Sequence, residues 1–486
     1  MNMPHTLHYL LLYTSLLALL GCQAHVQQEQ AQLVTRASHQ DAESLLKQAQ
    51  SAQQQWQNNG NQNNGDNHAL RHTYRLLEQA YGLRRDNINV QYAYYTSAFA
   101  LAASGIELTR GDIKNLYNEL HPVVQIAVPS PIRLDYMEMT QNEAANEARA
   151  ELLAKGIRQA PHDPYLWSHY ANVLYDQRHY YLAAAAAEQA HRIDQDNSVY
   201  LYQISHALDA LSQRNNCTYD EQALTRKAVK YANEASKKAS DNSHYISQVS
   251  YLYFKLGLVP LAYDRAQKSY SLEKNQWSAR QRASTSILMA KYDEAEEAAN
   301  YLLNTQRDPW AWLYFAQISI AQGQWAEASR YLLRLHEQQT LDFYGRLIAL
   351  WITALSDNNH QVNTHALTPP TDWAAAILGY LNSSDTAPQH LLDKARSRCE
   401  KTEAHFYIAF RFWQEGRQEE VKKHLKLATR QGAAPYLEHG IATVLLRAIS
   451  SEAIPALKPA LFRVFDTSSV ASCTARRSSK GMLMTP

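Results

Sequence analysis

The sequence predicts an all-α fold made of helix pairs stacked one on another. Only 15 of the 486 residues are glycine, about half the usual share, whereas alanine, glutamine, leucine and tyrosine are plentiful. This composition suits helices joined by short turns better than sheets with glycine-rich corners. An alternation of small and large residues also recurs at a period of about 34 residues, which is typical of solenoids. We therefore predict an α-solenoid, a superhelical array of antiparallel helix pairs in which each repeat packs on its neighbours.

The charge balance excludes one large class of partner. The 47 Lys and Arg residues nearly balance the 46 Asp and Glu residues, which leaves a formal net charge of +1. A chain without a basic excess has no overall field that attracts nucleic acid or an anionic lipid surface. We expect no nucleic-acid partner.

The chain begins with the signature of export. LHYLLLYTSLLALLGCQAH, residues 7–25, holds an uncharged apolar run of about fourteen residues, shorter than the roughly twenty that span a bilayer but the length of a signal-peptide core. We predict a signal peptide at residues 1–21. A plain secretory signal or an amino-terminal core helix are the alternatives to the lipid anchor considered next.

The tetrad LLGC, residues 19–22, resembles the lipobox of bacterial lipoproteins. The resemblance implies cleavage before Cys22, attachment of lipid to its sulfur, and anchoring through acyl chains whose burial contributes about 0.8 kcal/mol per methylene. The residue after the cysteine is Gln23 rather than Asp. In enteric-type bacteria this resemblance implies sorting to the outer membrane, on the side that faces the periplasm. We expect a lipid-anchored protein of the bacterial cell envelope.

Residues 22–67 are predicted to be a polar tether. They are dominated by Gln, Asn and Ala and end in QQQWQNNGNQNNGDN, which cannot bury enough apolar surface to fold alone. Within the tether, DAESLLKQAQSAQQQW is compatible with one helix. Helical periodicity begins at about residue 68.

Residues 164–197, PYLWSHYANVLYDQRHYYLAAAAAEQAHRIDQDN, resemble a tetratricopeptide repeat. Its small and large packing positions, the fourth, seventh, eighth, seventeenth, twentieth and twenty-seventh, are filled by Trp167, Tyr170, Ala171, Tyr180, Ala183 and Ala190. In such a unit, helices A and B can cross closely only where small residues lie at the contact.

The same register continues, so the resemblance covers residues 164–342. The later units are 198–242, 243–275, 276–308 and 309–342. The unit 198–242 is longer, and we place an insertion of about eleven residues relative to a 34-residue repeat in the turn between its two helices, around QRNNCTYDEQ.

Less regular segments flank this array. Residues 68–163 are predicted to be degenerate helical repeats interrupted by prolines, and residues 343–449 carboxy-terminal helical repeats. The polar stretch 357–373 separates the central array from the last, carboxy-terminal pair. Residues 450–486 form a tail without helical periodicity. Residues 373–439 also resemble the repeats of small enteric outer-membrane lipoproteins, a resemblance that implies an adaptor between cell-wall hydrolases and an envelope protease.

The sequence offers no site for chemistry. No GxGxxG, GxxxxGK, GxSxG or HExxH motif occurs; HEQQT at His336 lacks the second histidine, and the pair His68 and His72 lacks the glutamate of a zinc helix. The four cysteines show no CxxC spacing, so we expect neither a zinc site nor a disulfide framework. We expect Cys217 and Cys399 to be ordinary buried or half-buried thiols. We predict no catalytic residue, metal or cofactor.

The resemblance also implies a partner-binding groove. In the repeat family, positions 2, 5, 9, 12 and 13 of helix A line the concave face. Here they include Tyr165, Asn172, Tyr175, Asp176, Tyr202, His206, Asp209, His244, Tyr251, Lys255, Trp277 and Arg280. Aromatic and hydrogen-bonding side chains together suit an extended peptide, whose backbone needs polar partners and whose side chains need pockets.

We therefore expect a non-enzymatic envelope lipoprotein that acts as a scaffold or adaptor for one or more proteins or peptides, in cell-wall remodelling for instance. Two alternatives stay open. The first is an assembly factor for a pilus or secretion system. The second is a glycan-binding component of polysaccharide export, because aromatic faces serve peptides and sugars alike.

Overall fold

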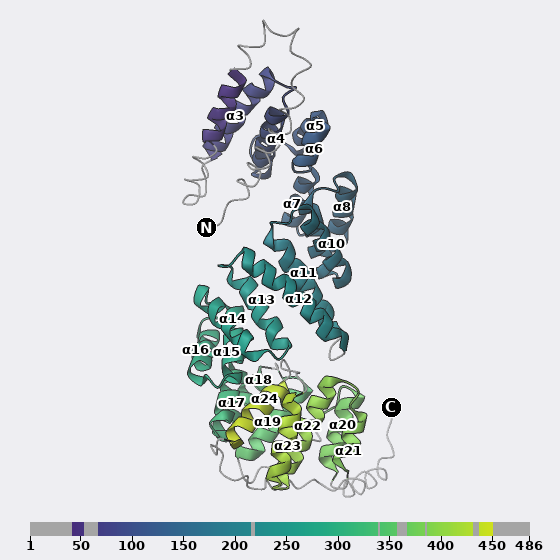
Figure 1. The fold of residues 1–486 in the computed structure, drawn as a ribbon, viewed down its shortest axis with the longest axis vertical. Helices are drawn as coiled ribbons and strands as arrows, with labels where there is room; N and C mark the ends of the chain where they lie inside the picture. Colours follow the sequence, from purple (N-terminus) through teal and green to yellow (C-terminus); the bar gives the residue numbers. More distant parts are fainter. Residues whose placement is uncertain are drawn as a thin grey trace, which may run out of the picture. The chain divides into compact units, whose positions relative to one another are not determined.

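The structure is a computed structural model that describes residues 41–52, 67–214, 219–338, 341–356, 367–383, 386–430 and 437–450. All regular structure in these ranges is helical, without a strand (Figure 1). The predicted signal peptide, Cys22, most of the tether and residues 451–486 lie outside the described residues. The chain divides into two compact units, residues 1–195 and 196–486.

Unit one contains the first helices of the chain, which pack in sequence-adjacent pairs such as α3 on α4 and α9 on α10. The helices are α3 (Asn67–Leu83), α4 (Ile88–Ala103), α5 (Arg110–Glu119), α6 (Pro122–Ala127), α7 (Ile132–Gln141), α8 (Asn146–Gln159), α9 (Pro164–Asp176) and α10 (Tyr180–Ile193). Residues 41–52, placed in the tether by the sequence, form a helix whose Leu46 and Ala49 pack with Leu77 and Tyr94. This part of the predicted tether therefore belongs to the folded core.

Capping residues explain where these helices begin. Thr109 and Asp112 form a capping box at α5, in which each side chain bonds the other residue's backbone N–H. Pro122 and Pro164 stand in the first turn of α6 and α9, where the missing N–H would have no helical partner. Pro122 and Pro164 thus mark helix starts.

Unit two contains the remaining helices. They are α11 (Ser198–Arg214), α12 (Tyr219–Lys238), α13 (Ser243–Lys255), α14 (Val259–Leu272), α15 (Gln276–Leu288), α16 (Tyr292–Asn304), α17 (Ala311–Ala321), α18 (Trp325–Glu337), α19 (Phe343–Ser356), α20 (Asp372–Asn382), α21 (Pro388–Lys394), α22 (Arg398–Gln414), α23 (Gln418–Arg430) and α24 (Leu437–Ser450). The pairs α11–α12, α13–α14, α15–α16, α17–α18 and α22–α23 pack face to face. The predicted tetratricopeptide-type α-solenoid is confirmed as the fold class.

Each 34-residue pattern contains one helix pair, and small residues lie where the two helices cross. Ala183, Ala262, Ala295 and Ala328, all at the twentieth position, are almost completely buried. A methyl side chain at the crossing lets the two backbones approach closely, and larger neighbours fill the remaining space. We call the first helix of each pair helix A and the second helix B.

One turn recurs between helices A and B. The fifteenth residue of four units adopts a left-handed backbone, with φ of 62° at Arg178, 74° at Gly257, 58° at Ala290 and 71° at Gly323. The next amide then bonds back to helix A, as in Gln324 N to Ser319 O at 2.8 Å. This is the Schellman ending of a helix, which glycine adopts without a side-chain penalty.

The longer unit 198–242 differs from its prediction. Its helices have 17 and 20 residues, against 13 and 14 in α13 and α14. The extra residues therefore lengthen α11 and α12, and only 215–218 fall between the helices. The expected long insertion in the turn is wrong, because residues such as Gln213 and Glu221 continue the helical hydrogen bonding.

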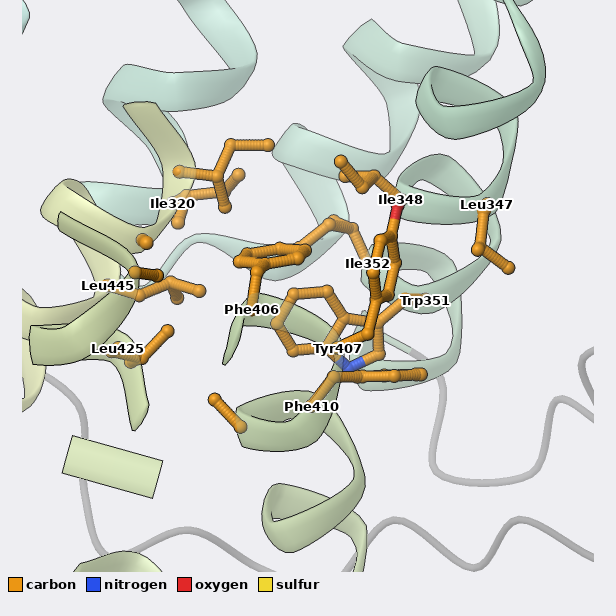
Figure 2. Close-up of a cluster of buried hydrophobic side chains, with 14 of the residues drawn as sticks. Ile320, Leu347, Ile348, Trp351, Ile352, Phe406, Tyr407, Phe410, Leu425 and Leu445 are labelled. Carbon is orange, nitrogen blue, oxygen red and sulfur yellow. The ribbon is translucent and has the colours of Figure 1, made fainter. Parts of the chain in front are cut away.

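The core of the carboxy-terminal part lies between helices that are distant in sequence. Trp351 of α19 lies 4.4 Å from Phe410 and 5.6 Å from Phe406 of α22, measured between ring centroids. Figure 2 shows these rings together with Ile320 of α17 and Leu445 of α24. Helices α17, α19, α22 and α24 thus share one apolar core.

Candidate partner-binding surface

The residues predicted to line a groove lie on helices A of four consecutive repeats. Four of them are on α9 of unit one. The other eight belong to α11, α13 and α15 of unit two, and these three helices A are neighbours in space. The two sets therefore belong to different compact units.

On α9, Tyr165 has partners inside the protein. Its ring lies 4.1 Å from the His169 ring, and the Arg133 guanidinium lies 4.7 Å from the ring centroid. Burial raises the pKa of Tyr165 and lowers that of His169 to about 4. Asn172 and Asp176, by contrast, are exposed.

Tyr175, also on α9, is half-buried, and its ring lies 5.1 Å from Tyr180 of α10. It therefore joins helix A to helix B while part of its surface remains accessible. The α9 set combines accessible polar groups with rings that also serve the packing.

On α11 and α13, three side chains form an accessible cluster. The Tyr202 ring stacks on His206 at 5.7 Å with an angle of 11°, and it meets His244 edge-on at 6.1 Å. His244 is exposed, and Tyr202 and His206 are half-buried. Burial lowers the pKa of His206, so its ring is neutral at pH 7. We call Tyr202, His206 and His244 the aromatic-histidine surface.

Asp209 and Lys255 lie inside the protein. Lys255 Nζ donates to Asp209 Oδ1 and to Ser212 Oγ, each at 2.7 Å, and both charged residues are only 4% exposed. The pair joins α11 to α13. Their charges are directed at each other, which leaves little of either side chain for a partner.

Tyr251 and Trp277 connect α13 to α15. Their ring centroids are 5.4 Å apart, and burial raises the pKa of Tyr251. Arg280 of α15 donates two hydrogen bonds, of 2.5 and 2.9 Å, to Asp308, which precedes α17. Tyr251, Trp277 and Arg280 thus keep part of their surface while they hold successive repeats together.

The face of helices A is closed beyond α15. Helix α24 packs on α17 and α15, and Arg447 donates to the carbonyls of Ile287 at 3.3 Å and Leu288 at 2.8 Å, at the carboxyl end of α15. A Cβ at Gly440 would lie 3.2 Å from Gln317 Nε2 of α17, so α24 comes close to that helix. A helix of this chain therefore covers part of the face where the family's groove is expected.

Sequence reasoning missed this closure. The sequence AWLYFAQISIA of α17 holds one signal, since it is apolar on all sides, which is typical of a helix that is buried all round. Arg398 of α22 also reaches Glu221 of α12, with a nitrogen–oxygen distance of 3.0 Å. Contacts between residues so far apart leave no periodic pattern.

The cysteine prediction needs a correction. Cys399, next to Arg398, is 3% exposed and disulfide-bonded rather than a free thiol. Scattered spacing without a CxxC pair hides a bond between distant segments, because only the fold brings two such cysteines together.

Two further properties concern metal ions and membranes. The described part of the chain contains no group of three His, Cys, Asp or Glu side chains arranged to hold a metal ion. Among the same residues, none of the helices combines the length and apolar character that crossing a bilayer requires.

No protein-family model and no curated protein matches the sequence. Solved structures similar in fold include YrrB, "a TPR protein with an unusual peptide-binding site", at 15% identity and a TM-score of 0.33, over 41% of this chain and 98% of that one. A tetratricopeptide repeat protein from Parabacteroides merdae matches at 14% identity and a TM-score of 0.35, over 65% of this chain and 97% of that one. Yeast Tom70 matches at 13% identity and a TM-score of 0.31, over 79% of this chain and 85% of that one.

Proposed function

We propose that this chain is an exported, lipid-anchored scaffold that binds an extended segment of another protein across helices α11 and α13. The aromatic-histidine surface carries the proposal. It combines a half-buried tyrosine with two imidazoles, one of them exposed, on helices A that precede α15, the first helix A on which α24 packs.

The chemistry of this surface favours a peptide. A tyrosine ring offers a large apolar contact at little cost in side-chain entropy, and its hydroxyl bonds a backbone group. The neutral imidazole of His206 donates with one nitrogen and accepts with the other, which matches the alternating N–H and C=O groups of an extended chain. Both the lipobox-like tetrad at Cys22 and the likeness of residues 373–439 to envelope adaptors favour a periplasm-facing position and a role in cell-wall remodelling.

A photo-crosslinking amino acid at position 244 tests the binding site in intact cells. Because His244 is exposed, we expect the chain to fold when this residue is replaced. We also expect the replaced chain to form a crosslinked adduct with a protein. The matched control is position 261 on α14, where Leu261 is also exposed, 48%, but lies on a helix B. Equal adducts at 244 and 261, or adducts to glycan alone, would refute a peptide site at this surface.

Affinity gives the second test, with the partner identified by crosslinking. Tyr202→Ala should weaken binding by more than tenfold, because truncation of a central aromatic anchor commonly costs about 2 kcal/mol or more. Leu261→Ala should leave binding unchanged.

Lipid attachment is tested separately. Metabolic labelling with a fatty-acid analogue should mark the natural chain and not the Cys22→Ser variant. Equal labelling of the two chains would contradict the anchor without affecting the binding proposal.

A further inference from the structure

Helix α22 carries two pairs of like ionisable side chains. Glu403 and Glu438 of α24 are both buried, and Glu438 acts electrostatically on Glu403, whereas His405 Nδ1 lies 3.1 Å from His424 Nδ1 of α23. Because residues two apart on an α-helix are rotated by about 200°, Glu403 and His405 point to opposite sides of α22. Each pair therefore connects α22 to different neighbours.

The two carboxyls lie in the apolar core. Glu403 is 5% and Glu438 2% exposed. Each accepts a hydrogen bond from a neutral donor: the Trp373 indole Nε1 of α20 lies 2.5 Å from Glu403 Oε2, and the Tyr407 hydroxyl 3.1 Å from Glu438 Oε1. These bonds join α20 and α24 to α22.

The titratable groups that act most strongly on Glu403 and Glu438 are acidic or neutral. Besides the effect of Glu438 on Glu403, they are Asp342, which precedes α19, Tyr344 on α19, and Glu400 and Tyr407 on α22. None of these residues is a cation. Burial and then Glu438 raise the pKa of Glu403, and burial raises that of Glu438. A protonated carboxyl suits this site, because a buried charge without a counter-ion is costly.

The imidazole pair has the opposite response to pH. His405 Nδ1 and His424 Nδ1 are 3.1 Å apart, so one ring donates a hydrogen that the other accepts, and a second added proton would set two donors against each other. The facing charges are Lys401 on α22 and Lys423 and Glu420 on α23.

Burial lowers the pKa of His405, and burial followed by the nearby His405 lowers the pKa of His424 to about 4. The rings are therefore neutral near pH 7. This state keeps the single hydrogen between the two nitrogens.

We propose that α22 is a two-sided pH sensor, which holds α20 and α24 through neutral carboxyls and α23 through neutral imidazoles, so that the carboxy-terminal helices loosen at both alkaline and acid pH. Groups with a raised pKa stabilise the fold fully below the ordinary value of 4.5, and this contribution is lost as the pH rises. Groups with a lowered pKa stabilise it fully above 6.5, and this contribution is lost as the pH falls. Protection of these helices against hydrogen exchange is therefore greatest between pH 4.5 and pH 6.5, the ordinary pKa values of the two kinds of group.

Hydrogen exchange of the full chain, measured by mass spectrometry over a pH series and corrected for intrinsic rates, tests the proposal. Protection of α22 and α24 should decline on both sides of the optimum, by up to about tenfold per pH unit for each proton exchanged. The double variant Glu403→Gln and Glu438→Gln keeps the shape of a neutral carboxyl and should lose the alkaline decline only. The double variant His405→Asn and His424→Asn should lose the acid decline only.

Controls separate this effect from general destabilisation. Glu419→Gln on α23 and His390→Asn on α21 change exposed residues and should leave both declines intact. Peptides from α13 give an internal reference. An alkaline decline that survives the glutamine variant, or an acid decline that survives the asparagine variant, would overturn the corresponding half of the sensor.

Infrared spectroscopy of the natural chain covers the case in which a double variant does not fold. An ordinary carboxyl is already ionised at about pH 6. The carbonyl band of a protonated acid should therefore be present at about pH 6 only if the buried carboxyls are protonated, and it should disappear as the pH is raised to about 9. A spectrum without this band at the lower pH would overturn the carboxyl half of the proposal.

Discussion

The two halves of unit two use the same helix pairs but bury different side chains on helices A. In α11 to α16, buried positions of helices A carry Asp209, Ser247, Gln248 and Thr285, whereas the buried side of α22 carries rings such as Phe406. Asp209 and Ser247 in the first half bond to neighbouring helices, through Lys255 of α13 and Ser269 of α14, and part of the face stays accessible at Tyr202 and His244. Aromatic groups in the second half exclude water and close the face. One repeat architecture therefore supports either a surface or a core, depending on what helix A presents.

The largest expected effect comes from removing a ring of the closed half. Trp351→Ala should destabilise α19, α22 and α24 by about 3–5 kcal/mol, the usual cost of such a cavity, because its ring contacts Phe406 and Phe410. Hydrogen exchange should rise there and stay nearly unchanged in α11. The matched Tyr202→Ala should cost far less stability, and an equal cost would remove the distinction between the halves.

The buried ion pair tests the polar half. Asp209→Ala leaves Lys255 buried without its carboxylate, a change that costs about 3 kcal/mol or more in comparable pairs, reduced here by the remaining bond to Ser212. Exchange of α13 should accelerate. The double change Asp209→Leu and Lys255→Met should restore much of the stability, and a cost additive over the two sites would show that they do not act as a pair.

The helix crossings should behave alike in both halves. Ala262→Leu in the first half and Ala328→Leu in the second should each cost about 1–3 kcal/mol, the usual effect of overpacking, since both alanines are completely buried. Thermal melting followed by circular dichroism gives the comparison. Tolerance of leucine at both positions would contradict the shared crossing geometry.

The smallest effect concerns the left-handed turn. Ala290→Gly in the first half should stabilise the chain by about 1 kcal/mol, because glycine adopts positive φ without the penalty of a Cβ. Gly323→Ala in the second half should destabilise it by a similar amount. Melting temperatures that move in the same direction for both changes would argue against one shared turn.

Much of the fold follows from local pattern. The positions of Trp167, Ala183 and Ala190 predict the α9–α10 pair, and Pro164 marks its start. The candidate surface was partly predictable as well, since Tyr202 and His244 are indeed accessible at least in part. Asp209 and Lys255 are buried instead. The position of a residue on helix A predicts the direction of its side chain, but it does not predict whether the neighbouring repeat supplies a partner that buries it.

The sequence by itself determined the helix pairs, their crossings and their turns, because these depend on residues within one repeat, where spacing decides which side chains meet. Only the tertiary structure decided that α24 covers α15 and α17, that Arg398 reaches Glu221, and that Cys399 is disulfide-bonded. The contacts of α24 and of Arg398 join residues more than a hundred positions apart. They depend on how small rotations between successive repeats add up, and no single repeat encodes that sum.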